Sequence, residues 1–202
     1  MRHKGWVMAT ESVPRLELLL PEHLSAEQRG LYRRLLDDAG GNDSHLLAGD
    51  GSLLGPFNAV ITVPDVGECL RSLARQLQSG ERVPAHLYET AILTSGAVWQ
   101  AEYMLAVHKQ RGMQVGLSLE VVEQLVDPTI GDVDAPGDVR TVWQFCHELT
   151  VTRSVSDSTY RQMVALVGTE GTVVVTILVG HYALIGGLLR AFRVPGLGSR
   201  EG

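Results

Sequence analysis

Apolar residues recur at helical spacing from Ser25 onward. Ser25 is a suitable N-cap, and Gln28 three residues later completes a capping-box pattern. Leu31 and Leu35 then fall on one helical face, and a Gly-rich break follows Ala39. The pattern predicts an amphipathic helix that begins after Ser25 and ends near Ala39.

Proline, glycine and polar capping residues divide the rest of the chain into further helices. Gly55-Pro56 opens a short one that Pro64 ends, Asp65 is expected to cap the next, and Pro84 suits the first turn of another. Ser118 is expected to cap a helix and 127–138 to form a loop. The expected helices are 56–63, 66–78, 84–112 with a turn inside it, 119–126, 139–152, 158–167 after an Asp157 cap, and 172–194 after a turn at 168–171. The predicted fold class is all-α.

The apolar stretch 172–189 admits two other interpretations. Its VVVTILV run has strand propensity, and its length barely suffices to cross a membrane. The run continues unbroken into HYALIGGLLRAF, however, and includes His181 and three glycines. A buried core helix is therefore the preferred interpretation, with no membrane partner.

Length and composition favour one domain in a reducing compartment. We expect an N-terminal extension over 1–24, a single helical domain over 25–194 and a flexible tail over 195–202. The net charge of −6, without a basic stripe, argues against nucleic acid. The N-terminus lacks a secretory h-region, and the two cysteines, Cys69 and Cys146, are far apart. Both observations favour a cytoplasmic protein with free thiols.

Three titratable residues in 84–112 are candidates for chemistry: Glu89, Glu102 and His108. In one straight helix, Glu89 and His108 would be ~28 Å apart and could not cooperate. A turn near Trp99-Gln100 lies midway between them, and Ser95-Gly96 weakens the helix just before it. Two antiparallel helices would then bring the carboxylate and the imidazole face to face. Such a pair either transfers protons or forms a structural hydrogen bond in the core, and from spacing alone the structural role is commoner.

The other histidines and aromatic residues give weaker evidence for a functional role. His108, His147 and His181 lie on separate predicted helices without ligand spacing, so we expect no metal and no other cofactor. His181, on an apolar helix, is more often a core residue than a catalyst. Trp99 and Tyr103 are expected to line the core or a pocket.

The order of several motifs resembles the carboxymuconolactone decarboxylase-like superfamily, which includes the alkylhydroperoxidase D-like proteins. The matching stretches are GPFNAVITVPDVGECLRSLARQL, YETAILTSGAVWQAEYMLAVH and FCHELTVTRSVSDSTYRQM with the apolar helix after it. The resemblance spans roughly 25–194. It implies a compact all-helical fold and a homo-oligomer, either a trimer or a hexamer.

The resemblance also implies which chemistry is absent. The family's peroxidases use a CxxC whose positions correspond here to Ala101 and Met104, and neither side chain can form a thiolate. The decarboxylase-like members resemble cofactor-free acid–base enzymes, with which Glu89, Glu102 and His108 agree. The family's Gly-Tyr-Tyr is Gly180-His181-Tyr182 in this chain, so the pocket gains an imidazole.

Three functional hypotheses follow. The first is a cofactor-independent lyase or isomerase for a small organic substrate, with His108 as proton shuttle, Glu89 as its orienting partner and Glu102 as a second acid–base group. In it, Trp99, Tyr103, Met104 and His181 would contact the substrate. The second is a non-catalytic ligand-binding or scaffolding protein of the same fold. The third, an alkylhydroperoxidase, is least favoured.

Overall fold

The computed structural model describes residues 13–40, 45–79 and 82–197, and the regular structure of these residues is helical apart from one isolated bridge, Leu47 to Leu53. This confirms the predicted all-α class. The helices are α1 (Ala26–Ala39), α2 (Pro56–Ile61), α3 (Pro64–Ser79), α4 (Ala85–Trp99), α5 (Glu102–Gln114), α6 (Leu119–Leu125), α7 (Gly137–His147) and α8 (Asp157–Ala191), with a 3-10 turn at Pro21–His23 and a π-helical turn at Glu148–Thr152.

Local capping chemistry begins and ends α1 as the sequence indicates. The Ser25 side chain accepts a hydrogen bond from the Gln28 backbone N–H, and the Gln28 side chain accepts one from the Ser25 backbone N–H. Gly40 ends the helix in the left-handed conformation, at φ 62°. Ser118 likewise accepts from the Val121 N–H at the start of α6, as predicted. These ends depend on residues within one turn of each other, which is why sequence patterns find them.

Two predicted caps are wrong, and one predicted turn is shorter than expected. Asp65 does not cap α3, because Pro64 is already helical and Asp65 lies in the first turn. Asp157 is the first helical residue of α8, and the Ser156 side chain is the cap, accepting from the Thr159 N–H. The predicted break between two helices is found at Gly168, where φ is 71° and ψ 175° and the chain kinks. It is a single residue rather than a turn over 168–171, and the segments on both sides together make up α8.

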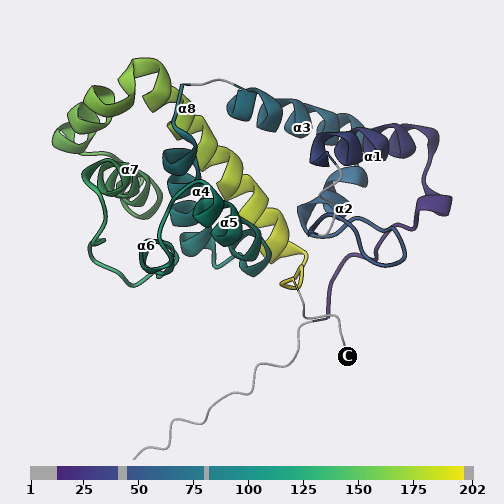
Figure 1. Cartoon of the computed structure of the whole chain (residues 1–202). Helices are drawn as coiled ribbons and strands as arrows, with labels where there is room; N and C mark the ends of the chain where they lie inside the picture. Colours follow the sequence, from purple (N-terminus) through teal and green to yellow (C-terminus); the bar gives the residue numbers. More distant parts are fainter. Residues whose placement is uncertain (1–12, 41–44, 80–81, 198–202) are drawn as a thin grey trace, which may run out of the picture.

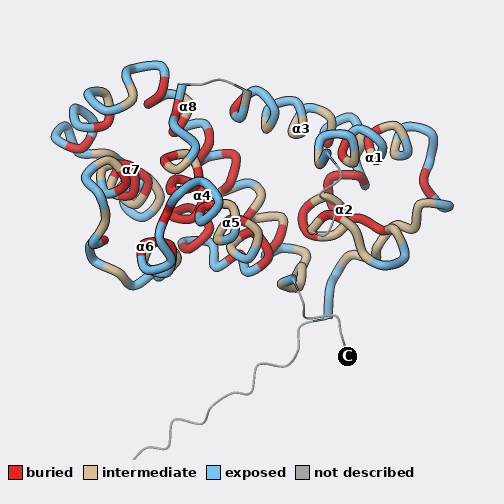
Figure 2. Tube along the Cα trace, in the orientation of Figure 1, coloured by how far each residue is buried: buried red, intermediate tan, exposed pale blue. Residues whose placement is uncertain are grey.

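Helix α8 is the centre of the larger helical layer. It packs against α4 and α7, and Figure 1 shows it running diagonally behind α4 and α5. By length and composition it is the one helix of the described residues that is apolar enough to cross a membrane, and 44% of its most apolar window is buried. The VVVTILV run is helical here, and Val175, Leu178 and Val179 belong to the core. Figure 2 shows the buried face concentrated where α4, α5 and α8 meet.

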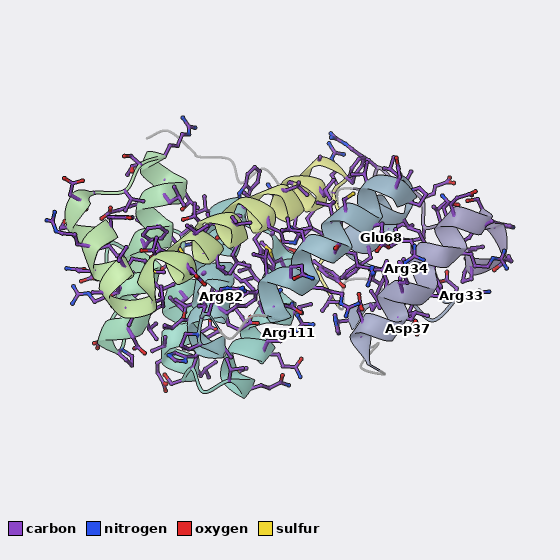
Figure 3. All side chains as sticks on the ribbon, turned by 90° about the horizontal axis from the view of Figure 1, so that it is seen from above. Arg33, Arg34, Asp37, Glu68, Arg82 and Arg111 are labelled. Atoms are coloured by element: carbon purple, nitrogen blue, oxygen red, sulfur yellow. The ribbon has the colours of Figure 1, made fainter. Side chains whose placement is uncertain are left out.

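Helices α1 to α3 form a second, smaller layer with its own apolar cluster, which includes Leu31, Leu35, Leu53 and Ile61. Ion pairs join the outer faces of α1 and α3. Arg34 Nε lies 2.8 Å from Glu68, and the two side chains face each other across the helices in Figure 3. This layer meets the larger one along α8. Of the predicted N-terminal extension over 1–24, residues 1–12 lie outside the described part of the chain, and residues 13–24 are described, with the Leu19 N–H donating to Asn58 Oδ1. Of the predicted tail over 195–202, residues 198–202 lie outside it.

Candidate functional site

The turn between α4 and α5 creates the site. Helix α4 ends at Trp99, Gln100 adopts the left-handed conformation with φ 47°, and α5 begins at Glu102. Gly96 allows the second helix to approach the first, since a Cβ there would lie 2.8 Å from the Leu105 side chain. The predicted hairpin near Trp99-Gln100 is therefore confirmed.

Glu89 and His108 meet across this hairpin. Glu89 Oε2 lies 2.7 Å from His108 Nδ1, and the two residues are 8% and 6% exposed. A carboxylate so close to Nδ1 accepts the ring proton there, which leaves the lone pair of a neutral imidazole on Nε2. No hydrogen bond occupies His108 Nε2 among the described residues. His108 thus presents a proton acceptor, held in orientation by Glu89.

The His108 ring lines a cavity of about 210 Å³ between the two helical layers. The walls come from α1, α2, α3, α5 and α8, so the cavity exists only when both layers are packed. Apolar wall residues include Phe57, Met104, Val107, Ile185 and Leu189. Its size suits a small organic molecule rather than a cofactor as large as a dinucleotide.

Three arginine side chains line the cavity, more positive charge than the sequence analysis placed at the site. Arg71 and Arg75 of α3 line it, but Asp38 faces them, with the Arg71 Nη1 to Asp38 Oδ2 distance at 2.7 Å. Arg111 of α5 also lines it, and its Nη2 lies 3.3 Å from His45 Nε2. No ion pair to a carboxylate is seen for Arg111 in the described structure.

Lys109, two residues before Arg111, does have a carboxylate partner: it is partly exposed and pairs with Glu123 at 3.0 Å.

The arginines on α3 were missed by sequence reasoning. The signal lay in the i, i+3, i+4, i+7 face formed by Arg71, Ala74, Arg75 and Gln78, all of which line the cavity.

His181 and Tyr182 of α8 form the wall opposite α3. The Tyr182 ring meets His108 edge to face, with centroids 5.2 Å apart, and meets His181 in the same way at 5.4 Å. His181 is 8% exposed, its buried Nδ1 has no hydrogen-bond partner, and burial lowers the pKa of this imidazole. Burial also raises the pKa of Tyr182, which stays a neutral phenol. Both histidines therefore flank one tyrosine on the cavity wall.

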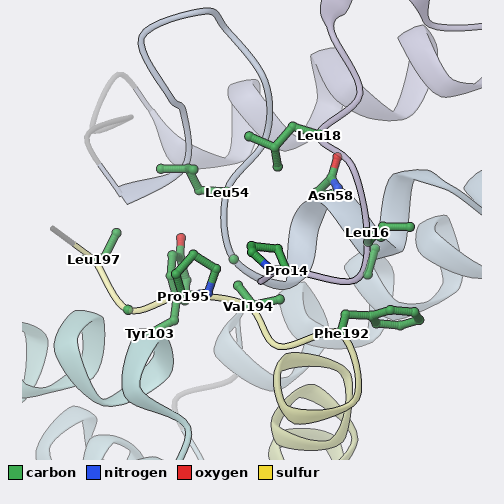
Figure 4. Close-up of a pocket in the computed structure, with 13 residues that line it drawn as sticks. Pro14, Leu16, Leu18, Leu54, Asn58, Tyr103, Phe192, Val194, Pro195 and Leu197 are labelled. Carbon is green, nitrogen blue, oxygen red and sulfur yellow. The ribbon is translucent and has the colours of Figure 1, made fainter. Parts of the chain in front are cut away.

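Tyr103 separates the main cavity from a second, smaller one. That cavity, of about 80 Å³, lies between the N-terminal segment near Pro14 and the chain after α8, and Tyr103 lines both (Figure 4). Gly55 holds the tyrosine ring closely, because a Cβ at this residue would lie 2.3 Å from the ring and its φ of 60° also disfavours side chains. The Tyr103 hydroxyl donates to the His45 carbonyl.

The structure does not bring every expected site residue together. Met104, Tyr103 and His181 line the cavity with His108. Glu102, at the first position of α5, is exposed and is not part of the cavity wall. Trp99 is 38% exposed and packs on Gly186 of α8. Glu102 was expected in the site from the family resemblance and Trp99 as an aromatic residue of the core or pocket, but both side chains project elsewhere.

The described residues offer no thiol or metal centre at the cavity. The peroxidase cysteine positions hold Ala101 and Met104, Cys146 is fully buried in the core, and Cys69 is exposed on α3. Burial raises the pKa of the Cys146 thiol, so it is a poor nucleophile. Within residues 13–40, 45–79 and 82–197, no three His, Cys, Asp or Glu side chains gather as metal ligands.

Comparisons with known proteins identify the fold. No protein-family model and no curated protein matches the sequence. Among solved structures, an uncharacterized peroxidase-related protein from Ralstonia eutropha JMP134 with an alkylhydroperoxidase AhpD core has a TM-score of 0.71 at 14% identity, over 93% of this chain and 94% of that one.

Two further structures agree. An uncharacterized peroxidase-related protein from Silicibacter sp. TM1040 has a TM-score of 0.68 at 10% identity, over 98% of both chains. A protein of unknown function from Agrobacterium tumefaciens has a TM-score of 0.61 at 14% identity, over 69% of this chain and 95% of that one. The chain therefore has the AhpD-like all-helical fold that its motif order predicted.

Proposed function

We propose that this protein is a cofactor-independent acid–base enzyme, a lyase or isomerase, that moves a proton on a small organic substrate. His108 is the proton acceptor and donor, and Glu89 holds its tautomer. The observation that carries the proposal is a buried carboxylate–imidazole pair, 2.7 Å apart, whose imidazole lines a cavity of about 210 Å³. A pair with a purely structural role would need no cavity beside it.

The charges around the cavity support an anionic substrate. Arg111 lines the cavity, and its side chain donates a hydrogen bond to His45 Nε2 rather than to a carboxylate. In the same wall, Arg71 pairs with both Asp38 and Glu68, and Arg75 pairs with Asp38. A carboxylate on the substrate would give Arg111 an anionic partner, and guanidinium groups bind such anions through paired hydrogen bonds.

A second candidate function is ligand binding without catalysis. The observation in its favour is Glu102, which lies exposed outside the cavity, so the site lacks the second acid–base carboxylate expected there, and the Asp38 carboxylate in the cavity wall is paired with arginines. A binder would use the same cavity and the same arginine. An alkylhydroperoxidase remains the least favoured function, because Ala101 and Met104 occupy the thiol positions.

The experiment is a turnover screen of small lactones and keto acids, followed by proton NMR, with wild-type protein and His108→Ala. We expect conversion of at least one compound by wild type and a 10²- to 10⁴-fold slower rate in the variant, roughly the contribution of one acid–base group. Conversion that His108→Ala leaves unchanged would refute the assignment. Binding without any conversion would favour the ligand-binding protein.

A matched control is available on α4, the helix that holds Glu89. His86 also pairs with a carboxylate, its Nε2 lying 2.9 Å from Asp138 Oδ2, but it is not part of the cavity wall. His86→Ala removes an imidazole from a similar pair without touching the site. Its turnover should equal that of wild type.

A further inference from the structure

His181 stands out as a buried polar residue that no structural role explains. Its Nδ1 is sealed in the protein without a hydrogen-bond partner, and it is the one buried side-chain nitrogen or oxygen in this condition among the described residues. Leaving a buried polar atom unpaired costs about 1–3 kcal/mol, so such atoms are rare unless they serve a function. The same ring lines the cavity that His108 lines.

The surroundings of the two ring nitrogens decide where the proton of His181 resides. Burial lowers its pKa, so the ring is neutral near neutral pH and carries one N–H. An N–H at the sealed Nδ1 would have no acceptor, whereas Nε2 is not sealed in this way. The proton therefore belongs on Nε2, which makes His181 a hydrogen-bond donor toward the cavity.

His108 has the opposite hydrogen-bonding role at its Nε2. Glu89 accepts the proton of its Nδ1 and leaves a lone pair on Nε2. The cavity wall therefore contains one imidazole that accepts and one that donates, and both contact the Tyr182 ring, at 5.2 and 5.4 Å between centroids. A carbonyl compound with a hydrogen on the neighbouring carbon fits this arrangement, because its oxygen accepts a hydrogen bond from one imidazole and its C–H can give a proton to the other.

We propose that His181 is the second catalytic residue, whose Nε2–H holds the carbonyl oxygen of the substrate while His108 Nε2 removes a proton from the adjacent carbon. This inference rests on the proposed function and names its substrate class, a small carbonyl compound with an acidic C–H, bound between α5 and α8. Arg111 is positioned to hold a carboxylate on the same molecule.

The step balances without any cofactor. The C–H bond breaks, its proton goes to His108 Nε2, and its electron pair forms a C=C bond to the former carbonyl carbon. The C=O π pair moves to the oxygen, whose negative charge is stabilised by the His181 N–H, while Glu89 stabilises the His108 imidazolium. Return of the proton to the same or a conjugated carbon restores both histidines.

The test uses 4-oxopentanoate, a small keto acid, in D₂O with full-length protein. Proton NMR follows replacement of hydrogen by deuterium next to the ketone, and calorimetry measures the affinity. Relative to wild type, His181→Phe should slow exchange ~10²- to 10³-fold, the usual loss for one donor to a developing oxyanion. Affinity should change by no more than a few-fold, and His181→Gln, which keeps an N–H donor, should recover part of the rate.

Each outcome decides something different. Exchange that is abolished in His108→Ala but normal in His181→Phe overturns the role of His181 and leaves the proposed function intact. No exchange in wild type overturns the proposed function for this substrate class. In that case ¹⁵N-histidine NMR of wild type decides on His181: a shift of its Nε2 signal on adding 4-oxopentanoate supports the ligand contact, and an unmoved signal overturns it.

Discussion

Glu89 and His108 are 19 residues apart in sequence, yet Oε2 of one lies 2.7 Å from Nδ1 of the other across the α4–α5 hairpin. Both side chains are nearly sealed from solvent. His108 is the side-chain partner of the buried Glu89 carboxylate, which therefore depends on it. The pair therefore links the stability of the hairpin to the chemistry of the site.

Removing the imidazole should destabilise the fold measurably. In His108→Ala, the Glu89 carboxylate is left buried without its partner, and the free energy of unfolding should fall by ~1–3 kcal/mol. In His86→Ala, the Asp138 side chain is 38% exposed and stays hydrated, so the loss should be below ~1 kcal/mol. Urea unfolding of both variants measures the difference. Equal losses of unfolding free energy in the two variants would show that Glu89 is not left as a buried, unpaired charge. Adding Glu89→Leu to His108→Ala removes that charge and should recover part of the stability.

Peroxide chemistry should be absent. Ala101 and Met104 cannot form thiolates, and Cys146 is buried with a raised pKa. We expect no turnover of hydrogen peroxide or alkyl hydroperoxides with dithiothreitol as reductant, measured by peroxide consumption. Robust turnover that Cys69→Ser or Cys146→Ser abolishes would contradict this view.

Two glycines of α8 should respond to alanine in opposite directions. A Cβ at Gly186 would lie 2.7 Å from Trp99 Cβ, so Gly186→Ala forces α4 and α8 apart and should destabilise by ~1–3 kcal/mol. Gly180 has no neighbouring heavy atom within 4 Å of such a Cβ. Gly180 lies on the same face of α8 as Ile177, so in an Ile177→Glu background, which keeps this face free of another copy, Gly180→Ala should stabilise the helix by ~0.5–1 kcal/mol. Thermal unfolding of the two variants tests this, and a shift of the same sign in both would refute the packing of Trp99 on α8.

The outer face of α8 should pack against another copy of the chain. Val173, Ile177 and Leu184 are 53%, 43% and 44% exposed on this helix, although each is a large apolar side chain. We expect a homo-oligomer, a trimer or hexamer, by light scattering at micromolar concentration, and a smaller species for Ile177→Glu because a charge would then be buried in the interface. Val66→Glu, which adds the same charge at an exposed valine of α3, should leave the mass unchanged. A wild-type monomer would contradict the expectation.

The sequence by itself determined the features that depend on neighbours in the chain. Ser25 with Gln28 begins α1, Gly40 ends it, and the unbroken apolar run makes α8 a helix, because capping and helical periodicity act within one or two turns. Even the Glu89–His108 pair follows from local information, since a turn placed midway between two residues brings them to the same depth on facing helices. The motif order also indicated the fold that the solved structures share.

Only the tertiary structure decided what the pair faces. The cavity lies between two helical layers, and Arg71, Asp38 and His181 reach it from helices far apart in sequence. Trp99 and Glu102 lie close to His108 along the chain but project elsewhere, since the direction of a side chain depends on helix rotation and packing rather than on sequence distance. The unpartnered nitrogen of His181 is likewise visible only when every neighbour is in place, because a missing hydrogen bond is a property of the packed interior.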